Sequence, residues 1–121
     1  MELHILDEEL SVCKMSSLND VDLESDLFFI GKTDDELSLV CPTNIIPENI
    51  LIHDDGWKGF RICGELDFSL IGILSKISTI LAENNIGIFA ISTFNTDYIL
   101  FKKENLQKVI SVMESNGYTF V

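Results

Sequence analysis

The order of hydrophobic periods after residue 56 constrains the fold of this 121-residue chain more than any other feature. An alternating strand pattern is followed by a broad helical stripe of leucine and isoleucine that ends near Asn84-Asn85. A hairpin that turns at Asn95-Thr96 comes next, and then a second helical stripe that Asn116-Gly117 closes. Strands are therefore expected at 57–63, 86–94, 97–101 and 118–121, and helices from 70 and from 106 onward.

This β-α-β-β-α-β order predicts a ferredoxin-like arrangement for the second half of the chain. The first half is less regular, with weak helical turns expected at 21–24 and after Pro47. A correspondence between its hairpin at 27–41 and the hairpin at 86–101 indicates a degenerate duplication, and Asp54-Asp55-Gly56 separates the halves. The predicted fold class is α+β, with two ferredoxin-like βαββαβ subdomains side by side, the first of them degenerate. Its strands are expected at 3–6, 10–15, 26–31 and 36–41.

Acidic residues outnumber basic ones by 20 to 8, and the resulting formal charge of −12 limits the partners of the chain. Phosphate binding needs clustered lysine and arginine, so nucleic acid is not expected, and the same repulsion disfavours an anionic membrane surface. No apolar run approaches the length of a membrane span, and the first ten residues carry acids where a secretory signal carries bases. A cytoplasmic location is the default expectation.

Cys13, Cys41 and Cys63 are widely spaced, and with His4 and His53 they form no pattern typical of disulfides or metal sites. We expect buried, unreactive thiols in a reducing compartment. The sequence lacks GxSxG, P-loop and HExxH motifs, and no histidine lies beside a candidate nucleophile. No catalytic residue, metal ligand or cofactor is therefore predicted, and an enzyme is not expected.

The first candidate site is the segment that joins the strand at 57–63 to the helix, with Gly72 in or near the first helical turn. Glycine inside a helix is less favourable than alanine, so its presence there needs a reason. One reason is a close approach of free backbone N–H groups to a ligand carboxylate, helped by the helix dipole. The other reason is close packing of the helix on the sheet, with Ser69 acting only as a cap.

The second candidate site is the tip of the second hairpin, residues 92–97 (STFNTD). Its hydroxyl, amide and carboxylate groups, Asp97 above all, suit the ammonium group of a small zwitterion. The alternative is a turn that satisfies its own backbone groups. In the first hairpin, residues 33–38 are either a solvated acidic turn or place Glu36 or Ser38 in a cleft between the halves.

Three separated segments together resemble a known family. They are TDDELSLVC (33–41), GELDFSLIGIL (64–74) and IGIFAISTFNTDYIL (86–100). They are similar to small bacterial proteins built from paired ACT domains, and to the ACT modules of the cytosolic arginine sensors that regulate growth signalling in animals. The resemblance extends from about residue 33 to residue 121, and residues before 33 match only a general strand pattern.

The resemblance implies a non-catalytic regulatory or sensor module, under allosteric control by an amino acid or a similar effector, that forms a homodimer. It also implies a degenerate ACT-like subdomain at 1–55 and an ACT domain at 56–121. Because residues 16–24 are a weak helix at best, one ligand site per chain is expected. The alternative function is a ligand-free module for homodimerisation or protein interaction.

The ligand site that the resemblance implies lies between the helix-opening segment and the hairpin tip. Backbone N–H groups of the first would hold the ligand carboxylate, and Asp97 of the second would face a positively charged group. The implied ligand-binding residues are Asp67, Phe68, Ser69, Leu70, Ile71, Gly72 and Ile73, then Ser92, Thr93, Phe94, Asn95, Thr96 and Asp97, with Glu36 and Ser38 from the partner half.

Overall fold

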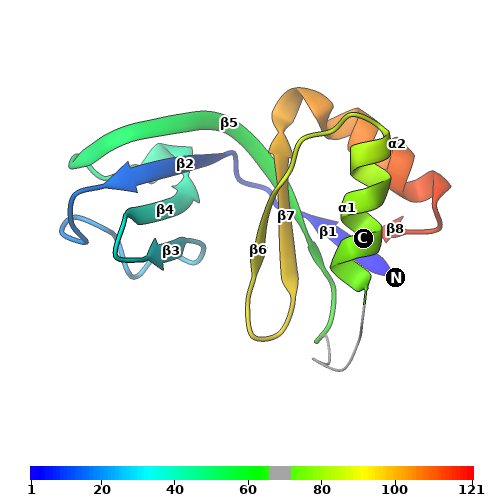
Figure 1. Cartoon of the computed structure of the whole chain (residues 1–121), viewed down its shortest axis with the longest axis horizontal. Coiled ribbons are helices and arrows are strands. Elements are labelled where there is room, and N and C mark those ends of the chain that lie inside the picture. The colour runs from blue at the N-terminus through cyan, green and yellow to red at the C-terminus, as the bar shows by residue number, and fades with distance from the viewer. Residues whose placement is uncertain (66–71) are drawn as a thin grey trace. The chain divides into compact units, whose positions relative to one another are not determined.

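A computed structural model describes residues 1–65 and 72–121, and the chain divides into two compact units (Figure 1). The helical unit combines Met1–Asp7 with Lys58–Val121, and the strand unit is Glu8–Trp57. The first seven residues therefore belong with the second half of the chain. This division rests on contacts within the chain, and the assignment of 1–55 and 56–121 as two ACT-like domains stays a prediction.

The helical unit has the predicted β-α-β-β-α-β order, which confirms the expected ferredoxin-like arrangement. Its sheet has the strand order β6-β7-β5-β1-β8, with both helices outside the sheet. The elements are β5 (Ile50–Ile62, of which the last part lies here), α1 (Ile73–Glu83), β6 (Phe89–Ser92), β7 (Asp97–Lys102), the 3₁₀ turn η2 (Lys103–Asn105), α2 (Leu106–Ser115) and β8 (Thr119–Phe120).

Strand β1 (Glu2–Ile5) is an addition to this arrangement, because it lies between the first and last strands of the β-α-β-β-α-β order. It runs antiparallel to β5, with Leu3 opposite Ile62, and parallel to β8, with Glu2 opposite Thr119. The side chain of Leu3 is fully buried. The centre of this sheet is thus completed by residues that are far away in the sequence.

Both helices cover the same face of the helical unit's sheet, as the two amphipathic stripes require. Each helix ends where the sequence predicts, because Asn85 and Gly117 adopt positive φ angles of 60° and 92° just beyond them. Neither helix in the described part of the chain is long and apolar enough to cross a membrane. The buried core residues are Leu3, Phe60, Ile62, Ile77, Ile80, Leu81, Ile86, Ile99, Phe101, Val109 and Met113.

The strand unit is a single antiparallel sheet in the order β3-β4-β2-β5, and all of its residues are described. It contains no α-helix, only strands, turns and the short 3₁₀ turn η1 (Thr43–Ile45). Its strands are β2 (Leu10–Met15), β3 (Phe29–Lys32), β4 (Leu37–Pro42) and the first part of β5. Cys13, Met15, Leu39 and Cys41 form its buried cluster.

Strand β5 corrects two expectations about residues 47–56. Pro47 is followed by a two-residue turn and then directly by β5, so no helical turn forms there. The segment Asp54-Asp55-Gly56 lies inside β5 and not in a turn, and the boundary between the two units falls just after it, between Trp57 and Lys58. The physical reason is a shift in the β2–β5 register between Leu10 and Val12, where Gly56 takes a φ of 84° that suits glycine.

The two hairpins repeat each other with an offset of 60 residues, which supports the duplication that the sequence suggests. Phe29 and Phe89 begin β3 and β6, Leu37 and Asp97 begin β4 and β7, and η1 and η2 follow at 43 and 103. The copies then differ, because the second continues into α2 whereas the first continues into β5. The first copy therefore lacks both helices of the second.

Candidate functional site

Five residues of the predicted helix-opening site, Asp67, Phe68, Ser69, Leu70 and Ile71, lie outside the described residues. The described part of α1 begins at Ile73, with Gly72 as its N-cap and with the amide N–H of Lys76 donating to the Gly72 carbonyl over 2.8 Å. No described side chain caps this end of the helix. The first backbone N–H groups of a helix have no acceptor within it, so this end favours negative charge.

Glycine at position 72 has a backbone reason besides the two that the sequence suggested. A close approach to a ligand stays a prediction, and among the described residues a Cβ atom built there meets no atom within 4 Å, so close helix–sheet packing does not require glycine. Its φ of 82° does, because this left-handed conformation is strained for residues with a side chain. Gly72 and Ile73 line a cavity of about 300 Å³ together with Lys76, Asn116 and Tyr118.

The hairpin tip at 92–97 satisfies several of its polar groups internally. The Ser92 hydroxyl donates to Asp97 Oδ1 over 2.6 Å, and the Thr93 hydroxyl donates to the carbonyl oxygen of Thr96 over 2.9 Å. These are the contacts of a self-satisfied turn, and they leave its ligand-binding role a prediction. Phe94 is 80% exposed. In the described part of the chain, Asp97 Oδ2 has no hydrogen-bond partner.

One contact ties the hairpin tip to the strand that leads into the helix-opening segment. The Thr96 hydroxyl donates to the carbonyl oxygen of Ile62, the last residue of β5, over 2.8 Å. The end of β5, the β6–β7 loop and the start of α1 lie at the same end of the helical unit (Figure 1). The described residues on either side of the candidate site therefore reach one edge of the sheet.

Glu36 and Ser38, which were expected to come from a partner half, lie in the strand unit. The Ser38 hydroxyl donates to Glu36 Oε1 over 2.6 Å. The Thr33 hydroxyl oxygen accepts a hydrogen bond from the backbone N–H of Glu36 over 3.1 Å. This turn closes as the other hairpin does, because the Thr33 amide donates to the Glu36 carbonyl just as Thr93 donates to Thr96. Glu36 and Ser38 also line a cavity of about 420 Å³, together with Val12, Lys14, Ile52, His53 and Asp54.

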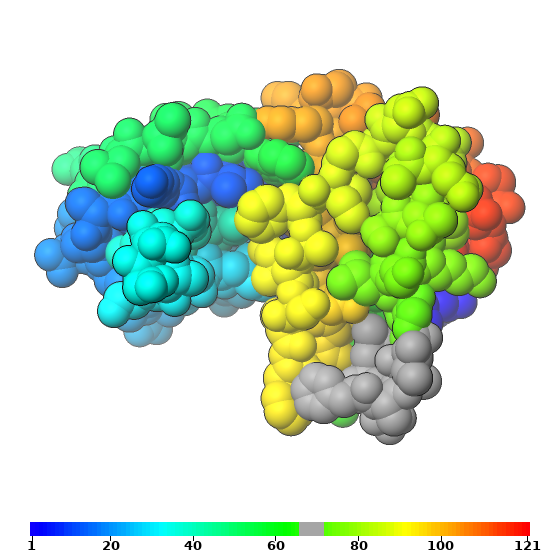
Figure 2. Space-filling view, viewed as in Figure 1, coloured from blue at the N-terminus to red at the C-terminus, as the bar shows by residue number. Residues whose placement is uncertain are grey.

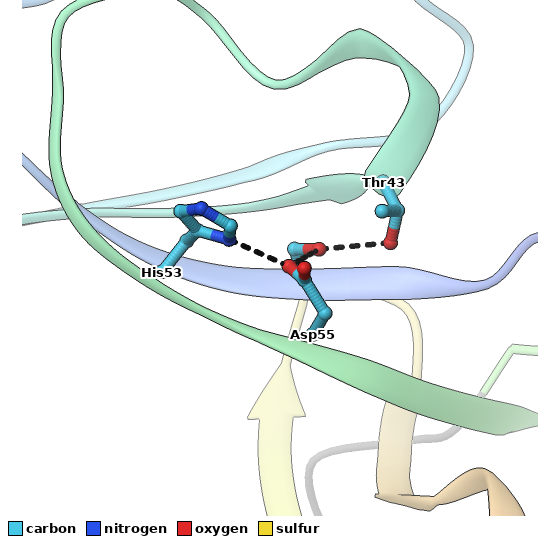
Figure 3. A network of polar contacts seen from close by, with 4 residues as sticks. Thr43, His53 and Asp55 are labelled. Atoms are coloured by element: carbon cyan, nitrogen blue, oxygen red, sulfur yellow. Dashed lines mark hydrogen bonds and ion pairs between the residues drawn. The ribbon is translucent and has the colours of Figure 1, made fainter.

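A polar network in the strand unit was missed by the sequence analysis. Asp55 Oδ1 accepts the Ser11 hydroxyl over 2.5 Å and lies 2.8 Å from His53 Nδ1, while Ser11 Oγ is 2.8 Å from Thr43 Oγ1 (Figure 3). Ser11 is fully buried, and the aspartate stands between the hydroxyl and the imidazole. A nucleophilic triad needs the imidazole beside the hydroxyl, so this network ties β2, β5 and η1 together and activates no nucleophile.

Two of the three cysteines are buried beside each other on neighbouring strands. The pKa of the Cys13 thiol is raised to about 12, chiefly by burial and in addition by the nearby Cys41 and the Asp55 carboxylate. Burial also raises the pKa of Cys41. Both thiols are therefore neutral near pH 7 and poor nucleophiles, because the thiolate is the reactive form. Cys63 is half-buried, so the expectation of buried thiols holds for two of the three cysteines. Among residues 1–65 and 72–121, no three His, Cys, Asp or Glu side chains are grouped as metal ligands.

Comparisons with known proteins agree with the fold. The family profile described as "ACT domain" matches residues 52–115. The crystal structure of protein Atu0741 from Agrobacterium tumefaciens is 30% identical, with a TM-score of 0.86 over 99% of this chain and 91% of that one. The ligand-free regulatory subunit of aspartate kinase from Thermus thermophilus has 9% identity and a TM-score of 0.64, covering 93% and 95%.

A third solved structure, described as a putative C-terminal regulatory domain of aspartate kinase from Porphyromonas gingivalis, is 14% identical to this chain. Its TM-score is 0.57, over 93% of this chain and 95% of that one. At these low identities the two aspartate kinase structures speak for the fold alone. The match to Atu0741 and the match to the family profile also indicate the family, because both rest on sequence similarity.

Proposed function

Because the chain belongs to the ACT domain family, we propose that it is a non-catalytic regulatory module that binds a small molecule, an amino acid. The ligand is held between residues 67–73 and the hairpin tip at 92–97. The observation that carries this proposal is the hydrogen bond from Thr96 to Ile62, because it fixes the tip beside the strand that precedes the helix-opening segment. A helix N-terminus and a carboxylate at one sheet edge suit the two charges of an amino acid.

Each end of the ligand has a proposed partner. The ligand carboxylate accepts hydrogen bonds from backbone N–H groups of the segment 67–73, where the helix dipole favours negative charge. Its ammonium group faces Asp97, whose Oδ1 is held by Ser92 and whose Oδ2 has no partner among the described residues. The bond from Ser92 orients the carboxylate before a ligand arrives, which lowers the entropy cost of binding.

The proposal includes a homodimer in the cytoplasm, in which Glu36 and Ser38 of a second copy complete the site. Strand β6 is an outer strand of the helical unit's sheet, and Phe89 on it is 37% exposed. An outer strand with an exposed aromatic side chain is a suitable place for a second copy to extend the sheet. The dimer would then regulate a partner allosterically as its ligand binds.

A thermal-shift screen of the purified chain against the twenty amino acids tests the proposal. A ligand at a hundred times its Kd stabilises the native state by about 2.7 kcal/mol, which raises Tm by roughly 10 °C for a chain of this size. Asp97→Ala should abolish the shift. Asp35→Ala is the matched control, since it removes an exposed carboxylate from the turn of the other hairpin. No shift with any amino acid, or an equal shift in both variants, contradicts the proposal.

The second candidate function is a ligand-free module for homodimerisation or protein interaction. It is favoured by the internal hydrogen bonds of the hairpin tip, where Ser92 is already bound to Asp97 and Thr93 to Thr96. Sedimentation of the same variants separates the two functions. If the Asp97→Ala variant loses the ligand response and keeps the wild-type sedimentation coefficient, the result supports the sensor. If the protein is a dimer and no variant responds to a ligand, the result supports the interaction module.

A further inference from the structure

The first part of β5 forms an outer edge of the strand unit. In the order β3-β4-β2-β5, strand β2 pairs along one side of it, with Cys13 opposite His53 and Lys14 opposite Ile52. No strand of Glu8–Trp57 pairs with its other side. Strand β7 pairs with β5 farther along, where Thr96 is bound to Ile62. The backbone along the outer side of residues 51–53 is therefore available to another strand.

The side chains on this edge are apolar and exposed. Leu51 is 63% exposed and Ile52 is 66% exposed, although successive residues of a strand point to opposite faces of the sheet. Both faces are therefore open at this point, as well as the edge. Atoms of this part of the chain lie at the surface in the space-filling view (Figure 2, green). A bare edge with aliphatic side chains is a ready template for strand addition.

The charge of the strand unit limits what can occupy this edge. It contains only two lysines but twelve acidic residues, a formal charge of −10, whereas the helical unit has six basic and eight acidic residues, a charge of −2. Two such units repel each other, so a second copy of this chain is disfavoured here. The same charge repels nucleic acid and anionic lipid. A basic protein segment is attracted.

We propose that the outer edge of residues 51–53 binds an extended, lysine- or arginine-rich segment of another protein as an additional β-strand. Main-chain hydrogen bonds to the edge provide affinity, and alternate side chains of the added strand lie over the two open faces. One face carries the cavity of about 420 Å³ lined by Ile52, Asp54 and Glu36. The carboxylates of Asp54 and Glu36 outnumber the one lysine of this cavity, Lys14. The cavity therefore favours a cationic side chain of the added strand.

Apart from Glu36, which the proposed amino-acid site takes from a second copy, the residues that carry this proposal lie outside that site. The edge lies in the strand unit, whereas residues 67–73 and 92–97 belong to the helical unit. Failure of either proposal therefore leaves the other standing. A small polycation such as a polyamine carries the right charge, but it offers no carbonyl and amide groups in the spacing of a strand.

The test uses the full chain and two short, end-capped peptides, one of alternating lysine and valine and one of alternating glutamate and valine. The lysine peptide should bind at least about tenfold more tightly in fluorescence anisotropy, and its binding should weaken as salt is raised. Amide hydrogen exchange at residues 51–53 should slow in its presence. Equal binding of both peptides, or protection confined to other residues, would overturn the proposal.

Ile52→Lys should abolish binding of the lysine peptide, because it places a cation on the edge that the peptide must cover. Leu23→Lys is the matched control, since Leu23 is 65% exposed, lies in the same unit outside any strand, and undergoes the same change of charge. Both positions are exposed, so both variants keep the fold. Equal loss in the two variants overturns the proposal. A wild-type dimer that Ile52→Lys dissociates also overturns it, because the occupant is then a second copy.

Discussion

Replacing Gly59 by alanine tests how closely β5 and β7 pack in the helical unit. A Cβ atom at position 59 would lie 2.5 Å from Leu100 Cδ2 and 3.1 Å from the carbonyl oxygen of Ile99. Leu100 is fully buried and cannot move its side chain into solvent, and the carbonyl oxygen belongs to the backbone of β7. The added methyl group therefore forces the two strands apart or strains Leu100.

The expected cost follows from two opposing contributions. Inserting a methyl group into a well-packed interior costs about 1–3 kcal/mol, and removing the flexibility of glycine from the unfolded chain returns about 0.4–1 kcal/mol. We expect Gly59→Ala to lower the free energy of unfolding by about 1–2 kcal/mol. In thermal unfolding, this loss corresponds to a fall in Tm of roughly 4–8 °C.

Urea denaturation followed by the fluorescence of Trp57, the single tryptophan, measures this loss. Gly31→Ala is the control, because a Cβ atom there meets only Ser38 Cβ, at 3.9 Å. We expect the control to keep the wild-type free energy of unfolding within about 0.5 kcal/mol. If Gly59→Ala is as stable as Gly31→Ala, with the same denaturant slope, the two strands have room between them and the packing argument is wrong.

Three further outcomes are expected. Ser11→Ala should lower the free energy of unfolding by about 1–2 kcal/mol in urea, because it leaves Asp55 without its buried hydroxyl donor. In native protein at pH 8, iodoacetamide should label Cys63 and leave Cys13 unlabelled by mass spectrometry, because the pKa of Cys13 is raised to about 12 and its thiolate is scarce at lower pH. Gly117→Ala should lower Tm by a few degrees in calorimetry, since its φ of 92° costs a residue with a side chain about 1 kcal/mol, and Gly117→Asn should lose less.

The second half of the fold was predictable because its signals are local. The stripe ending in Leu81 and the Asn116-Gly117 pair each specify an element within a few residues, and the structure confirms both helices. The pairing of Glu2 with Thr119 was not predictable, because the local sequence pattern of a strand does not indicate which distant strand it pairs with. Long-range pairing is decided by the packing of the whole unit.

The first part of β5 was missed because its pattern is not that of a buried strand. Leu51 and Ile52 are both exposed, so no alternation of apolar and polar residues is visible. Asp54-Asp55-Gly56 is typical of a turn, and only pairing with β2 overrides that preference. Strand propensity depends on neighbours more than helix propensity does, which explains why the error fell in this half of the chain.

For the candidate site, the polar hairpin tip was visible in the sequence, but the way in which it is held was not. Hydroxyl, amide and carboxylate groups at 92–97 are visible in the sequence, whereas the bond from Thr96 to Ile62 depends on how β7 lies beside β5. The network around Asp55 has no sequence signal, because Ser11, Thr43 and Asp55 come from three separate elements. The left-handed φ of Gly72 had a signal, a glycine directly before a helix.

The position of β1 has a consequence for synthesis on the ribosome. Its residues are made long before those of β8, the strand on one side of it, which begins at Thr119. At roughly 5–20 residues per second, β1 remains without that neighbour for about 10 s. During that interval Leu3, fully buried in the finished protein, has no complete site to enter. The helical unit therefore matures only after translation has passed β8, and nascent-chain quality control meets an unfinished sheet until then.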